Sequence, residues 1–366
     1  QVPRQVIARM TDSLQDRHRN VVGTGLKQQA RKAMATLLGA TKGYEICFGA
    51  NATTLLAKTA ALYQGVLSTT DEIVLGLENH LAHVEPWITL AKATGAKIVW
   101  WNPPVSLEKI LTEQTRLVAL THASNVVGQV RDLYQLIQTT RELSPRAHVV
   151  VDGVAAAPHV FAAVQAMDAD YYVVSCHKMF GPHCGSICGK STTLQLFSDD
   201  EKALKGLYEA GTVNFEACAG VQGMLEYFCA LGTGSPEDGS HAKNDTSCIE
   251  KAYSTIGDHE DQLTQTLIDG LHSSPKVKIL ETDAKTARRL PVVSFVHESI
   301  SCADLVNLCA KQRIICRQDT FISSEGFLDQ HPQFAQGFVR FSLVHYNTAE
   351  EVRNVLSYLE TLPNWV

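Results

Sequence analysis

Short apolar runs alternate with longer stretches of helical periodicity through the first half of the chain. Strands are predicted at 44–51, 71–79, 96–101, 116–125, 147–154 and 169–178, and helices at 53–67, 84–96 and 132–144. The apolar runs are continuous rather than alternating with polar residues, which is typical of strands buried on both faces. Strands that alternate with helices at this spacing predict an α/β domain with a mostly parallel central sheet and helices on both faces.

The pattern changes near residue 233. Residues 232–247 are rich in Gly, Ser, Asp and Asn, which predicts a linker or an exposed loop. After this stretch, helices are predicted at 248–271, 301–312 and 349–362, and strands at 290–298, 313–317 and 337–344. We therefore expect a large domain over 21–235 and a smaller α+β domain over 236–366, with residues 1–20 packing against the small domain.

The composition is that of an ordinary globular protein. Of the 366 residues 45% are hydrophobic and 19% are charged, and the net charge is −6, so nothing favours a nucleic-acid or membrane partner. No apolar run is long enough to cross a membrane, and the first twenty residues contain no signal-peptide core. Cysteines in apolar runs are expected to be buried free thiols of a cytoplasmic protein, namely Cys47, Cys176, Cys188 and Cys229. Cys184 and Cys188 have no second ligand pair nearby, so no metal site is expected.

Polar side chains follow the predicted strands at the point where each strand ends. They include Asn51, His80, Asn125, Asp152, Ser175, His177 and Lys178. Each alone has an ordinary explanation, such as a surface lysine or a turn-forming aspartate. Ligands of an open α/β sheet bind beyond the carboxyl ends of its strands, where all of these residues would meet. A lysine, a carboxylate and a helix start are what pyridoxal 5′-phosphate (PLP) needs for its Schiff base, its ring nitrogen and its phosphate.

Several stretches resemble one family and come in that family's order. The stretches are GANATT, LENHLAHVEPW, THASNVVG, VVVDGV, SCHKMFGP and VRFSLVHYNTAEEV. Together they resemble class V aminotransferases, and within that class the cysteine desulfurase-like proteins. The resemblance covers nearly the whole chain, and it implies the PLP fold type I architecture, PLP as cofactor and a homodimer with active sites shared across its interface.

The resemblance also implies roles for individual residues. Lys178 would form the Schiff base, Asp152 would pair with the ring nitrogen, His80 would stack on the ring, and Asn125 would lie near the phenolic oxygen. The phosphate would be held by Ala52, Thr53, Thr54, Ser175 and His177, with Thr212 reaching the partner subunit's phosphate. Arg340 would bind the substrate carboxylate, with Arg317 and Asn125 as further substrate-binding residues.

Two departures from the family pattern bear on the reaction. Ala155 stands where a glutamine often contacts the phenolic oxygen, and no cysteine stands near Ile322, where desulfurases carry the thiol that accepts sulfur. Cys316 has the pattern of a strand thiol. Cys302 begins a predicted helix, a position that lowers a thiol pKa, but nothing in the sequence brings it to the cofactor.

We therefore expect a PLP-dependent lyase that eliminates the sulfur substituent of cysteine or an S-substituted cysteine without the usual persulfide cysteine. An aminotransferase, an epimerase or a specialised biosynthetic PLP enzyme uses the same early chemistry and remains an alternative. The loop 318–336 should distinguish these reactions. A binding protein that kept only the fold is a third possibility, against which the set Lys178, Asp152, His80 and Arg340 argues.

Overall fold

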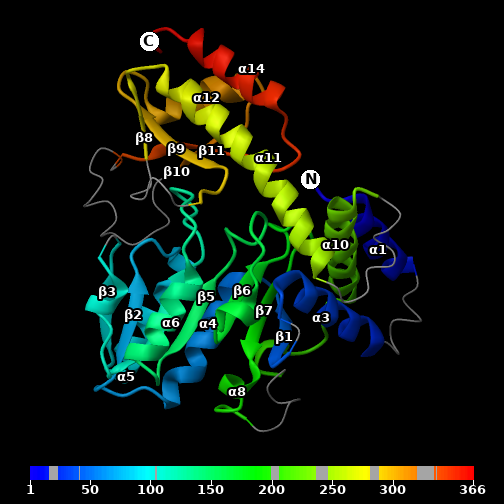
Figure 1. Cartoon of the computed structure of the whole chain (residues 1–366), viewed down its shortest axis with the longest axis vertical. Coiled ribbons are helices and arrows are strands. Elements are labelled where there is room, and N and C mark those ends of the chain that lie inside the picture. Colours follow the sequence, from blue (N-terminus) through cyan, green and yellow to red (C-terminus); the bar gives the residue numbers. More distant parts are fainter. Residues whose placement is uncertain are drawn as a thin grey trace. The chain divides into compact units, whose positions relative to one another are not determined.

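The chain divides into two compact units. The computed structural model describes residues 1–15, 24–40, 42–103, 105–198, 206–235, 246–280, 288–319, 334 and 336–366 (Figure 1). Unit 1 contains Gln1–His122 and Asp132–Thr255, and unit 2 contains Ala123–Arg131 and Ile256–Val366. The boundary after Thr255 thus falls inside the helix Ser247–His272 rather than at the expected residue 235, and unit 2 includes a short segment from the first half of the chain.

Unit 1 is built on one large sheet. Within its described residues the strand order is β1-β7-β6-β5-β4-β2-β3. The strands are β1 (Tyr44–Gly49), β2 (Glu72–Gly76), β3 (Lys97–Trp101), β4 (Thr115–Thr121), β5 (His148–Asp152), β6 (Tyr171–Ser175) and β7 (Gly185–Lys190). Neighbouring strands from β6 to β3 are parallel, and β7 pairs antiparallel with both β1 and β6. The predicted mostly parallel sheet is confirmed.

Helices cover this sheet and join its strands. They are α3 (Thr24–Leu38), α4 (Ala52–Leu62), α5 (Glu85–Thr94), α6 (Leu133–Leu143), α7 (Val164–Met167) and α8 (Ser191–Leu194), with short 3-10 turns η1 (Tyr63–Gly65), η2 (Leu81–His83) and η3 (Leu107–Lys109). Ile73 and Leu75 pack into a cluster with α4 and α5, and Val74 between them is fully buried as well. Because alternate strand residues point to opposite faces, burial of all three means that the sheet is covered on both faces.

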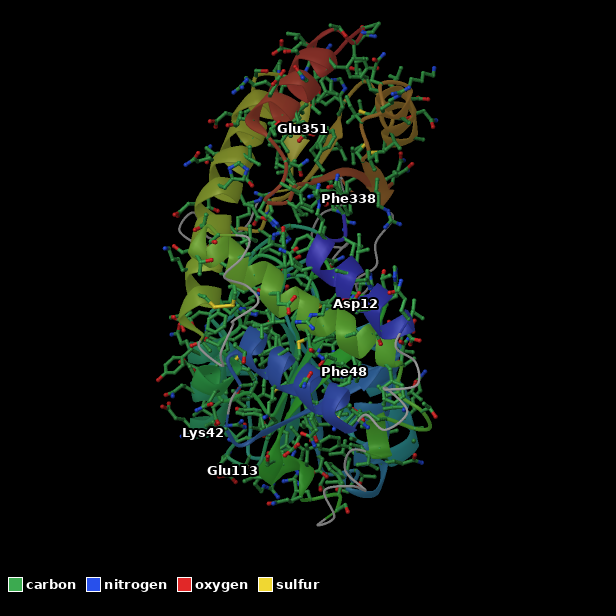
Figure 2. The ribbon with its side chains drawn as sticks, turned by 90° about the vertical axis from the view of Figure 1, so that its right-hand side faces the viewer. Asp12, Lys42, Phe48, Glu113, Phe338 and Glu351 are labelled. Carbon is green, nitrogen blue, oxygen red and sulfur yellow. A yellow bond between two sulfur atoms is a disulfide. The ribbon has the colours of Figure 1, made fainter. Side chains whose placement is uncertain are left out.

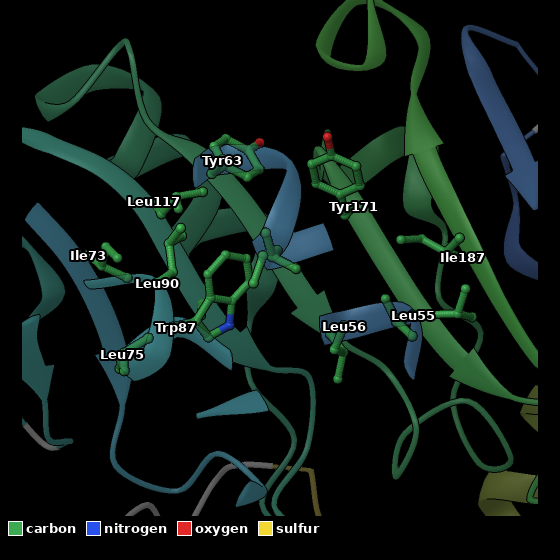
Figure 3. Packing of buried hydrophobic residues seen from close by; sticks show 14 of the residues in the cluster. Leu55, Leu56, Tyr63, Ile73, Leu75, Trp87, Leu90, Leu117, Tyr171 and Ile187 are labelled. Atoms are coloured by element: carbon green, nitrogen blue, oxygen red, sulfur yellow. The ribbon is translucent and has the colours of Figure 1, made fainter. Parts of the chain in front are cut away.

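Aromatic side chains fill the core between the sheet and α4 and α5 (Figure 3). Tyr63 meets Trp87 and Tyr171 edge to face, with ring centroids 6.4 Å and 6.5 Å apart. Trp87 and Tyr171 are fully buried, and Tyr63 is 1% exposed. Edge-to-face contacts add to the burial energy of such rings, so this cluster fixes α4 firmly against the strands.

Strand β7 was missed by the sequence prediction because its segment contains Gly185 and Gly189, and glycine is depleted in strands. Here glycine permits a close approach. A Cβ on Gly185 would lie 2.5 Å from the Asn51 carbonyl carbon and 2.7 Å from the Ala52 nitrogen. The absence of a side chain at Gly185 therefore lets the start of α4 lie directly against β7.

Helix α1 (Arg4–Gln15) lies along α10 (Phe215–Thr233) within unit 1, as Figures 1 and 2 both show. A Cβ on Gly223 would lie 2.6 Å from the Val6 Cα atom, so glycine is needed for this close helix contact. An ion pair between Arg9 and Glu226 joins the same two helices. We expected residues 1–20 to pack with the small domain, whereas the structure assigns α1 to unit 1.

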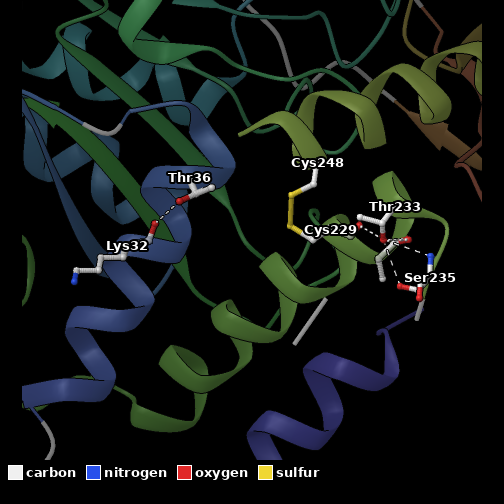
Figure 4. Close-up of a disulfide and its surroundings, with 7 residues drawn as sticks. Lys32, Thr36, Cys229, Thr233, Ser235 and Cys248 are labelled. Atoms are coloured by element: carbon white, nitrogen blue, oxygen red, sulfur yellow. Dashed lines mark hydrogen bonds between the residues drawn. A yellow bond between two sulfur atoms is a disulfide. The ribbon is translucent and has the colours of Figure 1, made fainter. Parts of the chain in front are cut away.

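A disulfide joins Cys229 in α10 to Cys248 at the start of α11 (Ser247–His272) (Figure 4). The expectation that Cys229 is a free thiol is therefore wrong. Its partner lies 19 residues later in a different helix, and no spacing in the sequence indicates that the two helix ends meet. Cys47, Cys176 and Cys188 are buried free thiols, as expected.

Unit 2 contains an antiparallel sheet with the order β10-β11-β9-β8 among its described residues. Its elements are β8 (Val277–Ile279), β9 (Val292–His297), α12 (Cys302–Lys311), β10 (Arg317–Asp319), β11 (Phe338–Ser342) and α14 (Ala349–Glu360). The predicted α+β character is confirmed, although β10 begins where the predicted strand 313–317 ends. Phe338, labelled in Figure 2, packs with Val126 and Val127, which explains why residues 123–131 belong to this unit.

In the described parts of both units, no helix has the length and apolar character needed to cross a membrane.

Candidate active site

The carboxyl ends of β5 and β6 carry Asp152 and Lys178. Asp152 is the last residue of β5, and Lys178 follows the end of the neighbouring parallel strand β6 by three residues. Asp152 is 6% exposed, and its Oδ1 accepts the Val154 N–H at 2.9 Å. The Lys178 side chain is exposed. Both residues thus end or follow neighbouring parallel strands, and their predicted roles toward a cofactor stay a prediction.

A tight turn holds Lys178. The Lys178 N–H donates to the Ser175 carbonyl at 3.0 Å, and the Gly181 N–H donates to the Cys176 carbonyl at 2.8 Å. A Cβ on Gly181 would lie 2.1 Å from the Met224 Sδ and 3.0 Å from the Cys176 oxygen. The turn therefore packs closely on α10, and the lysine stands on backbone that is fixed on both sides.

The start of α4 offers backbone donors to an anion. Asn51 is the N-cap of this helix, and its Oδ1 accepts the Thr54 N–H at 2.9 Å. The first N–H groups of a helix have no partner inside the helix. The Asn51 side chain occupies the Thr54 N–H, so the Ala52 and Thr53 N–H groups are the donors that can bind an anion. The sequence prediction assigned Thr54 to the phosphate together with Ala52 and Thr53. It missed that Asn51 caps the helix, although asparagine is a common residue at this position.

Ser175 and two histidines lie near one another after β6. The Ser175 hydroxyl and His177 Nδ1 are 2.9 Å apart, and the His177 and His183 rings stack with centroids 5.0 Å apart. Burial, followed by the nearby His183 and Lys178, lowers the pKa of His177. An anion such as a phosphate would offset this effect by favouring the protonated imidazole.

A cavity of about 550 Å³ opens beside these groups within unit 1. Its walls include Ala50 and Thr54 at the start of α4, His183 after the lysine turn, and Thr212 before α10. Lys178 and Asp152 are not among the residues that line this cavity. An amine, a buried carboxylate on the next strand and a helix start are the groups that PLP requires, so the residue types present fit this cofactor.

His80 and His83 follow β2. His80 is the N-cap of η2, and its Nδ1 accepts the Ala82 N–H at 3.1 Å, so the neutral ring carries its proton on Nε2. His83 was missed by the sequence prediction. It is fully buried, accepts the Trp87 indole N–H at Nδ1 (3.3 Å) and donates from Nε2 to the Val150 carbonyl at 3.1 Å. Burial lowers the pKa of His83, an effect that the Asp152 carboxylate opposes.

The three predicted substrate-binding residues lie together in unit 2. Arg340 in β11 donates from Nη1 to the Asn125 carbonyl at 2.8 Å. Arg317 in β10 stands directly opposite Arg340 in the antiparallel pair. Segment 123–131 thus brings Asn125 to Arg340 within the same unit, a contact between residues 215 positions apart that sequence patterns did not predict.

The two thiols near the predicted nucleophile position are poorly suited to accept sulfur. Hydrogen bonding to Cys309 raises the pKa of Cys316 well above its ordinary value. Burial raises the pKa of Cys302, which contradicts a lowered value at its helix start. The position near Ile322, and most of the loop 318–336, lie outside the described residues.

Comparisons with known proteins agree with this fold. The chain is 31% identical over 354 residues to the aminotransferase-like protein FGM3 of Gibberella zeae, covering 92% of this chain and 83% of the relative. It is 28% identical over 342 residues to the cysteine desulfurase-like protein ustD of Aspergillus flavus, covering 87% and 73%. The crystal structure of the cysteine desulfurase CsdA from Escherichia coli superposes with a TM-score of 0.79 at 23% identity, covering 98% of this chain and 91% of CsdA, which shows the shared fold. The model of the aminotransferase class-V family matches residues 1–355, and the chain belongs to this family of PLP-dependent enzymes.

Proposed function

We propose that this protein is a PLP-dependent lyase that breaks the Cβ–S bond of cysteine or an S-substituted cysteine. The observation that carries the proposal is that the buried Asp152 ends β5 while Lys178 follows the neighbouring parallel strand β6. When bound, PLP withdraws electrons from the α-carbon of an amino acid and so makes its proton acidic.

Each residue then has a distinct task. Asp152, whose Oδ1 is held by the Val154 N–H, would pair with the ring nitrogen of PLP. The Ala52 and Thr53 N–H groups, with Ser175 and His177, bind the phosphate. The Lys178 amine would take the α-proton of the substrate, and His80, with its proton on Nε2, would stack on the cofactor ring. Arg340 binds the substrate carboxylate, for which the planar guanidinium is well matched.

The choice of C–S bond cleavage rests on relatives and on departures from their pattern. UstD carries the name cysteine desulfurase-like, and the fold is that of a cysteine desulfurase. No cysteine stands at the expected nucleophile position. In the proposed reaction the α-proton goes to Lys178, and the sulfur leaves with the Cβ–S electron pair as a thiolate, which is then protonated. The three-carbon product takes up water and becomes pyruvate and ammonia.

The proposal is tested by reconstituting the protein with PLP and incubating it with L-cysteine and S-methyl-L-cysteine without a keto acid. We expect sulfide or methanethiol together with equal amounts of pyruvate. Lys178→Ala should abolish both products, whereas Lys92→Ala, on the exposed side of α5, should not change them. A strict need for a keto acid would identify an aminotransferase, and recovery of the D-amino acid would identify an epimerase.

We also propose that the enzyme is a homodimer in which Thr212 contacts the partner subunit's phosphate. The proposal rests on the resemblance of the turn that contains Thr212 to that of the family, and in this chain Thr212 lines the cavity that also contains Thr54 and His183. Sedimentation equilibrium gives the mass directly, and a monomer that binds PLP with full affinity would contradict the proposal.

A further inference from the structure

Phe180 lies two residues after Lys178 and has a backbone conformation that aromatic residues rarely adopt. Its φ is +64°, in the left-handed region that favours glycine. The six residues from Cys176 to Gly181 form a turn that is closed by the bond from the Gly181 N–H to the Cys176 carbonyl, at 2.8 Å. This bond and the left-handed fifth residue are those of a Schellman motif, in which glycine usually takes the left-handed position.

Glycine in place of Phe180 would remove the steric conflict between the Cβ atom and the backbone. A conformation of this kind persists only where the surrounding structure holds it, and such residues gather at functional sites. What distinguishes phenylalanine from glycine here is a large side chain and the contacts that it makes.

The Phe180 ring packs on helix α10. It is 6% exposed, and its centroid lies 6.2 Å from that of Tyr227, edge to face, and 6.4 Å from that of Phe228. Phe228 is fully buried and stacks on Tyr253 of α11, with centroids 5.1 Å apart. Aromatic contacts at these distances add to the energy gained by burying the rings. The Phe180 ring thus attaches the lysine turn to a surface of α10 that is itself fixed.

The same row of rings reaches the segment after Asp152. The Tyr253 hydroxyl donates to the Ala157 carbonyl at 2.7 Å, and the Ala157 N–H donates to the Gly153 carbonyl at 2.8 Å. Gly153 directly follows Asp152 at the end of β5. The turn that carries Lys178 and the segment that follows Asp152 are therefore held by one set of aromatic contacts within unit 1.

We propose that Phe180 is a positioning residue for Lys178, because its ring fixes the turn from which the lysine amine reaches the cofactor. The inference rests on the proposed function only for the role of Lys178 as the residue that binds PLP. Backbone and ring of Phe180 have opposite effects: the left-handed backbone lowers stability, and the ring holds the turn on α10. In a residue with a structural role alone, stability and the position of the lysine would change together.

The test compares substitutions that separate the backbone from the ring. Phe180→Gly relieves the left-handed backbone and removes the ring, Phe180→Ala removes the ring alone, and Phe180→Tyr keeps both. PLP is mixed with each apo protein, and the appearance of the borohydride-reducible cofactor absorbance is followed by stopped flow. Tm is measured by calorimetry on the same samples.

We expect Phe180→Gly and Phe180→Ala to form this absorbance band about 10–100-fold more slowly than the wild type, because small displacements of a reacting group have effects of this size. Phe180→Tyr should form it at the wild-type rate. The Tm of Phe180→Gly should lie about 2–6 °C above that of Phe180→Ala, since only alanine keeps the unfavourable backbone. The rate thus follows the ring, whereas the difference in Tm between the two small variants follows the backbone.

Hydrogen exchange of the apo protein gives a measure that does not depend on PLP. The Gly181 amide should exchange faster in Phe180→Gly than in the wild type, although the backbone conformation of the turn is more favourable for glycine. Arg313→Gly is the matched control, because Arg313 also has a positive φ (+60°) but lies in unit 2, outside the lysine turn. It relieves the same kind of backbone and should leave the rate of band formation unchanged.

The outcomes separate this inference from the function on which it rests. If the wild type forms no borohydride-reducible band with PLP, the proposed function fails and the inference fails with it. If the wild type forms the band and Phe180→Gly forms it equally fast, only the inference fails. A rate that follows Tm, so that Phe180→Gly falls between the wild type and Phe180→Ala, would identify a structural role alone and would also refute the inference.

Discussion

Replacing Gly185 by alanine should weaken cofactor binding without unfolding the protein. The added Cβ would lie 2.5–2.8 Å from three backbone atoms of Asn51 and Ala52, where carbon atoms normally stay about 3.5–4.0 Å apart. Neither neighbour is a flexible side chain, so β7 or the start of α4 has to move by about 1 Å to reach such a separation. Overpacking of this kind costs about 1–3 kcal/mol of stability.

The same movement displaces the Ala52 and Thr53 N–H groups that we assign to the phosphate. Loss of one charge-assisted hydrogen bond costs about 1.5–3 kcal/mol, which corresponds to a roughly 10–100-fold weaker PLP affinity. The fall in stability corresponds to about 2–4 °C in Tm for each kcal/mol in a unit of this size.

PLP is titrated into apo protein while the absorbance of the bound cofactor is recorded, and Tm is measured on the same samples. Gly65→Ala is the matched control, because a Cβ at Gly65 meets nothing within 4 Å. Wild-type affinity and Tm in Gly185→Ala would refute the steric argument. A lower Tm with unchanged PLP affinity would show that the start of α4 does not bind the phosphate.

Three further predictions concern single groups. Lys178→Ala should abolish the borohydride-reducible cofactor absorbance, and retention of that signal would remove Lys178 from its proposed role. Burial lowers the pKa of His83, so this histidine binds a proton more tightly in the unfolded chain than in the folded one. The free energy of unfolding should therefore be highest above pH 6.5, the ordinary histidine pKa, and should fall as the pH drops below it. Thermal melts from pH 5 to 8 should show this dependence of Tm on pH. His83→Gln should reduce the dependence only in part, because the pKa of His148 is lowered as well. An unchanged dependence in His83→Gln would contradict the assignment to His83. Cys229→Ser should lower the free energy of unfolding by about 3 kcal/mol, as expected for a closed loop of this length, and dithiothreitol should destabilise the wild type but not the variant.

The sequence predicted those parts of the fold that depend on local periodicity and on strand order. Asp152 and Lys178 could be assigned to the ends of neighbouring strands because parallel strands align their carboxyl ends, a rule that needs no side-chain detail. Strand β7 was not predicted because its glycines weaken the strand pattern. The need for glycine at Gly185 becomes visible only in the fold, where the start of α4 lies against β7.

Long-range contacts account for the rest of what was missed. His83 looks like any histidine in a helix-forming stretch, and only the fold supplies Trp87 and the Val150 carbonyl as its partners. The bond between Cys229 and Cys248 likewise needs two helix ends to meet. Such contacts are determined by tertiary packing, which neither propensity nor spacing encodes.

The assignment of Ala123–Arg131 to unit 2 has a consequence for how this enzyme can be divided. Residues 256–366 are not a complete module, because the carbonyl that orients Arg340 belongs to Asn125, more than a hundred residues earlier. A fragment cut at Thr255 would keep the arginine and lose its anchor. Within the intact chain, Asn125 and Arg340 belong to one compact unit, so any motion of that unit moves this arginine and the carbonyl that holds it together.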